Sequence, residues 1–117
     1  MPAKIRTEYG EISFSEELIA DIAGLATIEC YGLVGMANKS AKDGFAELLK
    51  KENLRKGVKV TIDSNEEVVI DLYIIVEFGT RISVIADNII SKVKYSVETH
   101  TGLTVKMVNV NVQGVRV

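Results

Sequence analysis

The sequence predicts an α+β fold in which a small mixed β-sheet is covered on one face by two main helices, forming a two-layer sandwich. Residues 58–62 and 68–78 alternate apolar and polar side chains with the period of two that is typical of strands. Residues 13–32 and 82–101 repeat apolar side chains at three- and four-residue steps, as amphipathic helices do. A last alternating stretch begins at residue 103 and predicts a C-terminal strand.

The composition indicates one ordinary globular domain, residues 1–117. The chain is 47% hydrophobic and 26% charged, which is enough apolar material for a core. Its net charge of -2 gives no reason to expect binding to nucleic acid or anionic lipid. The N-terminus lacks a signal-peptide h-region, and the most apolar run, 68–76, is far shorter than the roughly 20 residues a membrane span needs. We therefore expect a cytoplasmic protein without direct membrane insertion.

The first helix has clear start and stop signals. In SFSEELIADIAGLATIECYG, Ser13 or Ser15 can cap the helix, and Glu16 and Glu17 lie near the positive end of the helix dipole. Gly32 is the expected terminator, because glycine readily adopts the left-handed conformation that ends many helices.

Shorter elements surround this helix. Residues 8–14 look like a short strand, and residues 32–37 form a short irregular or helical stretch. Residues 45–51 can form a short helix, and Gly57 ends the polar segment that follows it.

The two alternating stretches 58–62 and 68–78 predict a β-hairpin. The second strand carries apolar residues on both faces, which indicates a central position in the sheet. In the C-terminal strand the alternation changes phase after Met107, and this predicts a β-bulge or a bend there.

The stretch DLYIIVEFGTRISVIADNII joins a strand to a helix at Gly79. A nucleophile elbow at such a joint requires a serine, cysteine or threonine, with a histidine base elsewhere. Thr80 is the only hydroxyl in this turn. We instead expect Gly79 to permit the turn and Thr80 or Ser83 to cap the helix.

The sequence offers no catalytic residues, no metal site and no cofactor site. His100 is the only histidine, and its place at the end of a helix explains it without catalysis. Cys30 is the only cysteine and is expected to be a buried, inert thiol. Neither a Rossmann nor a P-loop glycine pattern is present. We therefore expect a protein that is not an enzyme.

An alternative interpretation is a KH-like nucleic-acid-binding module. The sequence GLVG matches the GxxG loop with which KH domains clamp nucleotides, although its two middle residues are apolar rather than basic. The alternative nucleic-acid contacts are Gly32, Gly35, Lys50, Lys51, Arg55 and Lys56.

The C-terminal sequence VNVNVQGVRV predicts a surface for self-association. Val108, Val110 and Val112 are expected to face the core, and the three amides between them then share the outer face. An edge strand usually carries lysine, proline or a bulge as protection against pairing. If this strand is an edge rather than a central strand, its backbone can pair with another copy or a partner segment. The residues of this self-association edge are Asn109, Asn111 and Gln113.

Four stretches together resemble one family over nearly the whole chain. They are ECYGLVGMA, NLRKGVKVTI, VVIDLYIIVEFGTRISVIADNI and TGLTVKMVNVNVQGV. In this order they resemble the bacterial alkaline shock protein family, an envelope stress response family that includes small YloU-like proteins.

The resemblance implies a bacterial cytosolic protein without an established enzymatic activity. It also implies a role in cell-envelope homeostasis, self-association into a homo-oligomer, and docking to an unidentified membrane-associated protein at the inner face of the membrane. It offers no catalytic residues to transfer to this chain.

Overall fold

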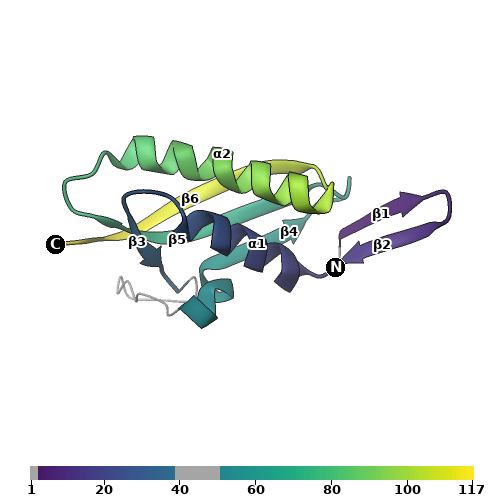
Figure 1. Ribbon diagram of the computed structural model, residues 1–117, viewed down its shortest axis with the longest axis horizontal. Coiled ribbons are helices and arrows are strands. Elements are labelled where there is room, and N and C mark those ends of the chain that lie inside the picture. The colour runs from purple at the N-terminus through teal and green to yellow at the C-terminus, as the bar shows by residue number, and fades with distance from the viewer. Residues whose placement is uncertain (1–2, 39–50) are drawn as a thin grey trace.

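The computed structural model describes residues 3–38 and 51–117 (Figure 1). These residues form six strands, two α-helices and one 3-10 helix. In chain order they are β1 (Ala3–Thr7), β2 (Gly10–Phe14), α1 (Glu16–Ile28), β3 (Leu33–Met36), the 3-10 helix η1 (Lys51–Gly57), β4 (Val58–Ile62), β5 (Val68–Glu77), α2 (Ile82–Thr101) and β6 (Val105–Arg116).

Strand β5 is the centre of the main sheet. β6 pairs with it in parallel from Val68 to Glu77, along its whole length. The antiparallel strands β4 and β3 pair with its first and second halves, at 68–72 and 74–76. A strand has two edges, so β4 and β3 share one edge of β5 while β6 occupies the other. The predicted hairpin, the central second strand and the mixed sheet are all confirmed.

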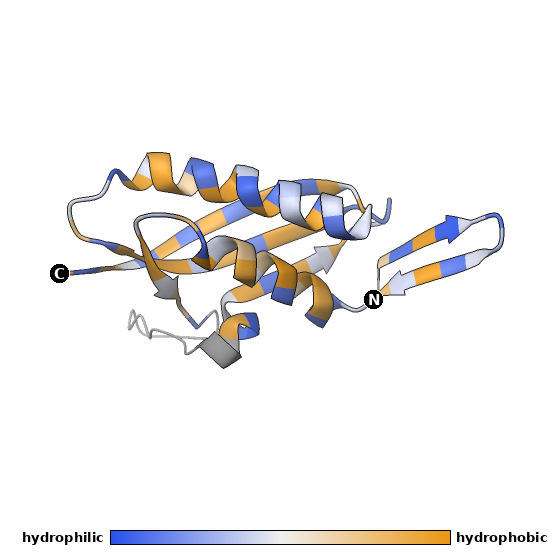
Figure 2. Ribbon diagram, viewed as in Figure 1, coloured by the Kyte–Doolittle hydropathy of each residue, from blue (hydrophilic) through white to orange (hydrophobic). Residues whose placement is uncertain are grey.

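Both main helices cover the same face of this sheet (Figure 1). Figure 2 shows apolar residues along β5 and apolar residues alternating with polar ones along α2. The α+β two-layer fold expected from the sequence is therefore confirmed. The core between the layers contains, among others, Ile19 and Ala23 of α1, Leu72 of β5, and Ile89 and Val93 of α2.

The predicted helix signals are correct in part. The Ser15 hydroxyl oxygen accepts a hydrogen bond from the Leu18 N–H at 3.1 Å, so Ser15 is the N-cap of α1. The helix ends at Ile28, before Gly32, which instead has a φ of 89° in the turn leading to β3. Gly102 ends α2 with a φ of 76°, as expected.

The expected cap of α2 is wrong. Arg81 occupies the N-cap position, and its side chain makes no capping hydrogen bond. The Thr80 hydroxyl donates backwards to the Glu77 carbonyl at 2.6 Å, so it closes the strand-to-helix turn instead of capping the helix.

Two short elements differ from the sequence-based expectation. The strand-like stretch 8–14 is the second half of a hairpin, because β1 precedes it and pairs with it through a turn at Glu8 and Tyr9. The stretch 32–37, expected to be irregular or helical, contains strand β3. Most of the helix expected at 45–51 lies outside the described residues.

The phase change in the C-terminal strand is a β-bulge, one residue earlier than expected. Val105 pairs with Val68 and Met107 pairs with Val69, so Lys106 is the extra residue. Met107 is consequently about half exposed, and the valines that follow return to the core side.

Gly79 allows the chain to turn from β5 into α2. Its φ is 87°, and a Cβ added there would meet no atom within 4 Å. We expect Gly79→Val to lower the free energy of unfolding by about 1–3 kcal/mol, because a branched side chain disfavours positive φ even where space is free. Urea unfolding followed by circular dichroism measures this.

The matched control is Gly10→Val. Gly10 is also surrounded by open space, but it is not among the glycines with positive φ. Its replacement should leave stability unchanged or slightly higher, since valine favours strands. Equal losses at both positions would show that backbone conformation is not the cause.

Candidate interaction surface

Strand β6 is an edge strand of the described sheet. Its only strand partner there is β5, and it extends over 12 residues from Val105 to Arg116. Its other edge therefore presents backbone N–H and C=O groups that no described strand pairs with. The long connection through α2 places β6 parallel to β5, as parallel neighbours require.

The side chains of β6 divide between two faces as the sequence predicts. Val108 is buried, and Val110 and Val112 pack against the core. The amides between them lie on the face away from the helices. A second bulge follows Val112, because Ile74 pairs with Val112 while Ile75 pairs with Gly114.

Two of the three amides bond within the sheet, which the sequence did not indicate. The Asn109 amide nitrogen donates to an Asp71 carboxylate oxygen at 2.8 Å. The Asn111 amide nitrogen donates to the Leu72 carbonyl at 3.2 Å. Gln113 is exposed. The amides thus fasten β6 to β5, and the part of β6 left for pairing is its backbone edge.

The glycines of the GxxG sequence do not form a loop between helices. Gly32 lies in the turn before β3, and Gly35 is a residue of β3 that pairs with Ile75. KH-type recognition uses such glycines in an exposed loop that approaches the nucleic-acid backbone. Gly35 is instead buried in the sheet.

The basic residues of the same alternative are only partly described. Lys50 lies outside the described residues, and Lys51 begins η1. The Arg55 guanidinium donates to both carboxylate oxygens of Asp21, at 2.7 and 2.9 Å. This hydrogen bonding raises the pKa of Arg55 further above its usual value. Lys56 is exposed at the end of η1.

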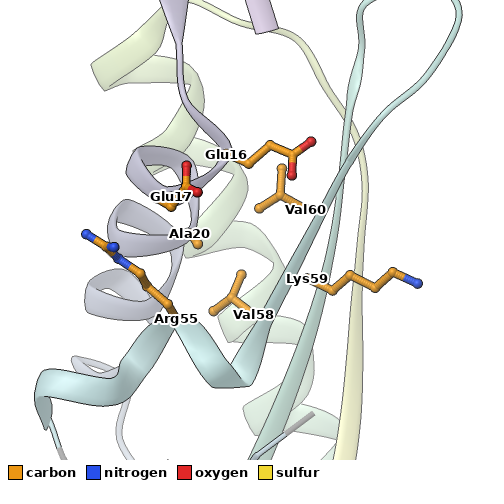
Figure 3. A pocket seen from close by; sticks show the side chains of 7 residues that line it. All are labelled: Glu16, Glu17, Ala20, Arg55, Val58, Lys59 and Val60. Atoms are coloured by element: carbon orange, nitrogen blue, oxygen red, sulfur yellow. The ribbon is translucent and has the colours of Figure 1, made fainter. Parts of the chain in front are cut away.

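A hollow of about 420 Å³ lies between α1, η1 and the edge strand β4 (Figure 3). Val58 and Val60 project towards α1, while Lys59 points to the other side of β4 (Figure 3). Among the described residues, its lining contains no histidine, cysteine, serine or threonine. The lining residues are Glu16, Glu17, Ala20, Arg55, Val58, Lys59 and Val60.

A second hollow, of about 590 Å³, lies where β3, the end of β5 and the C-terminus meet. Its lining combines apolar side chains with one carboxylate and one guanidinium. The lining residues are Leu33, Val34, Glu77, Phe78, Arg116 and Val117.

The nucleophile and the base that a nucleophile elbow would need are far apart. Thr80 precedes α2, and His100 lies near the end of this 20-residue helix. At 1.5 Å per residue they are separated by roughly 30 Å, so His100 cannot act as a base for Thr80. The His100 Nδ1 instead lies 2.9 Å from the Ser96 carbonyl of the same helix.

Cys30 is a partly buried thiol just after α1. Its Sγ lies 3.7 Å from the Ala26 carbonyl oxygen. Burial raises the pKa of the Cys30 thiol, which disfavours the reactive thiolate. In the described part of the chain, no three His, Cys, Asp or Glu side chains form a group able to hold a metal ion.

The structure defines a small α+β domain with a helix-covered sheet and an open edge strand, and its sequence matches a known family. Residues 4–117 match the model of the alkaline shock protein family, which is described as having a cell envelope-related function. The chain belongs to this family, so the resemblance seen in the sequence is confirmed. Within residues 3–38 and 51–117, no helix is long and apolar enough to cross a membrane.

Several bacterial proteins are similar to this chain. It is 52% identical to "Uncharacterized protein YloU" of Bacillus subtilis (strain 168), over 100% of this chain and 98% of the relative. It is 43% identical to "Uncharacterized protein Spy1614" of Streptococcus pyogenes, over 100% and 97% of the two chains. A "Stress response regulator gls24 homolog" of Streptococcus pyogenes is 31% identical, over 92% of this chain and 59% of the relative. No solved structure matches.

The positions of His100 and Cys30 lead to a prediction about both. Each should tolerate replacement by alanine, because the His100 ring contacts a carbonyl of its own helix and the Cys30 thiol is partly buried. We expect folded His100→Ala and Cys30→Ala variants to restore a deletion strain under envelope stress as well as the wild type does. A folded variant that failed as completely as the empty vector would contradict this.

Proposed function

We propose that this protein is a non-enzymatic, self-associating scaffold or interaction protein in the cell-envelope stress response and envelope homeostasis. The observation that carries the proposal is the open edge of β6, which is 12 residues long and has only β5 as a strand partner in the described sheet. Strand addition at such an edge joins two chains through backbone hydrogen bonds.

In the proposed assembly, a second copy pairs with the regular part of β6. Bulges follow Val105 and Val112, so 107–112 is the longest stretch that keeps a constant phase. Six residues match the usual length of a strand. Antiparallel pairing with Val110 facing Val110 of the second copy continues the sheet from one copy into the other and keeps the valines on the helix-covered side of both.

The proposed place of action is the cytoplasm, at the inner face of the membrane. The family's cell envelope-related description supports the link to the envelope. No helix in the described part of the chain can span a membrane, so the proposed attachment runs through a membrane-associated protein partner.

The proposal of a non-enzymatic role rests on the distances and environments of the reactive groups. Thr80 and His100 lie at opposite ends of α2, and the Thr80 hydroxyl is engaged with the Glu77 carbonyl. The described residues that line the hollow in Figure 3 are charged and aliphatic, and they include no nucleophile–base pair. These features support a protein that acts by binding.

Self-association through β6 predicts the behaviour of Asn111→Lys. Asn111 is half-buried on the face away from the helices, so lysine there adds a charge beside the pairing edge of each copy without entering the core. We expect the association constant, measured by analytical ultracentrifugation, to fall roughly tenfold or more because like charges meet in the paired strands.

Thr61→Lys is the matched control. Thr61 is exposed on β4, the strand on the opposite side of β5, so the same charge is added to an edge that the proposal does not use. It should leave association unchanged. Equal effects at both positions, or none at Asn111, would remove β6 as the assembly surface.

The nucleic-acid alternative leads to a separate prediction. The net charge of -2, the buried Gly35 and the pairing of Arg55 with Asp21 leave little basic surface for phosphate. We expect binding to single-stranded RNA to be weak and salt-sensitive at physiological salt, measured by fluorescence anisotropy.

The exposed lysines of this region allow the opposite result to be recognised. Lys56→Glu with Lys59→Glu changes only exposed side chains. Submicromolar, sequence-selective binding that this double variant abolishes would favour the KH-like function. Gly32 is unsuitable for the test, since a Cβ there would clash with Ile85 and disturb the fold.

A further inference from the structure

The N-terminal hairpin stands apart from the rest of the molecule. β1 and β2 form their own two-stranded sheet, separate from the main one. The hairpin projects from one end of the body (Figure 1), and the molecule measures 53 Å along its longest axis against 26 and 24 Å across. An isolated two-stranded hairpin is marginally stable in water, and additional strands or a packed face are normally needed.

One face of the hairpin is apolar, and only its base is covered. Ala3 lies opposite Phe14 and Ile5 lies opposite Ile12, so these four side chains share a face. Ala3, Ile5 and Phe14 pack against the core of the body. Ile12 remains 47% exposed, and Tyr9 at the tip is 95% exposed. The apolar face thus extends outward from the core, and its outer half has no described partner.

The opposite face of the hairpin is charged, and its charges are unevenly divided. β1 supplies Lys4 and Arg6, whereas β2 supplies Glu11 and Ser13 at the facing positions. The Lys4 nitrogen lies 3.6 Å from Glu11, and the Arg6 nitrogen lies 3.5 Å from the same carboxylate. The two edges of the hairpin therefore differ in charge.

From these observations we propose that β2 pairs antiparallel with β2 of a second copy, joining two hairpins into a four-stranded sheet. Pairing centred on Ile12 places the Ile12 side chains of both copies side by side on the apolar face. It also places Glu11 opposite Ser13 of the second copy, so no like charges are opposed. The face formed by Ile5, Ile12 and their counterparts then spans four strands.

The charges select β2 over β1 as the joining edge. Pairing of two β1 strands centred on Ile5 would place Lys4 opposite Arg6 of the second copy, twice in each interface. Like charges directly opposite each other destabilise strand pairs. The β2 edge has no such opposition, so a second copy is the occupant that fits it.

This interface deepens the proposed self-association and rests on that proposal for its biological purpose, but it uses different residues from β6. A twofold axis through Ile12 makes the contact isologous, with the same patch used by both copies. The hairpin interface and the β6 edge can therefore be tested separately.

Cross-linking at position 12 is the direct test. In a Cys30→Ala background, which removes the natural thiol, we introduce Ile12→Cys and add oxidised glutathione to the full chain. Facing residues of antiparallel neighbours have Cα atoms about 4.5–5.5 Å apart, within the range of a disulfide. We expect a covalent dimer on a non-reducing gel.

Ile5→Cys in the same background is the matched control. Position 5 lies on the same face but on the outer strand of the proposed four-stranded sheet. The two copies are then three strand spacings apart, roughly 14 Å, which is too far for a disulfide. Cross-linking at position 5 instead of position 12 would move the interface to β1 and overturn the proposal.

A second measurement separates this interface from β6. Ile12→Lys brings two like charges together at the twofold axis and should weaken association about tenfold in sedimentation experiments, with or without Asn111→Lys. Leu25→Lys is the control, because Leu25 on α1 is also 47% exposed. Circular dichroism confirms that each variant is folded.

The outcomes distinguish the two proposals. If Asn111→Lys weakens association while Ile12→Lys and the position-12 cross-link show nothing, the hairpin interface is wrong and the β6 edge stands. If only the hairpin variants have effects, β6 is not the assembly surface. A wild-type chain that stays monomeric at high concentration, without a position-12 cross-link, would overturn both.

Discussion

The fold depends on β5 being paired along both edges while its core-facing side chains are buried beneath two helices. Ile70, Leu72, Ile74 and Val76 are all fully buried. Each such side chain contributes on the order of 1.5–3 kcal/mol when removed from water. β4 and β3 are held against one edge and β6 against the other, so every other strand of the main sheet takes its place from β5. The helices then have one apolar face to cover.

This central position also explains where the sheet remains open. A sheet three strands wide has only one strand with both edges paired, and β5 takes that place. The bulges in β6 and the positive-φ turn at Gly79 adjust the flanking elements to β5, and the Asn109 amide adds a bond from β6 to Asp71. The strand edges and the projecting hairpin are therefore among the surfaces that the described part of the fold leaves open to a partner.

The sequence predicted the elements whose periodicity was long, and it failed where local chemistry or neighbouring strands decided the outcome. The period of two over 68–78 and the apolar spacing over 82–101 were sufficient to place β5 and α2. β1 was missed because its alternation of apolar and polar residues is only a few residues long, and its strand form depends on pairing with β2. β3 was missed for a similar reason, since its four residues become a strand by pairing with β5. The prediction for Thr80 failed because its hydroxyl bonds back to Glu77 and not forward to the helix.

For the candidate surface, the sequence raised the edge position of the C-terminal strand, which the strand order shows, but it did not indicate the role of the strand's amides. Alternation alone placed Val108, Val110 and Val112 towards the core, and it suggested that the intervening amides were available to a partner. Strand order decides what those amides meet, and no pattern within β6 shows that Asp71 and the Leu72 carbonyl lie beside it. With Asn109 and Asn111 bonded inside the sheet, any pairing at this edge must depend on the backbone groups of 107–112. Specificity must then come from the register and the charges of neighbouring side chains, which is the same constraint that the charge distribution imposes on the hairpin.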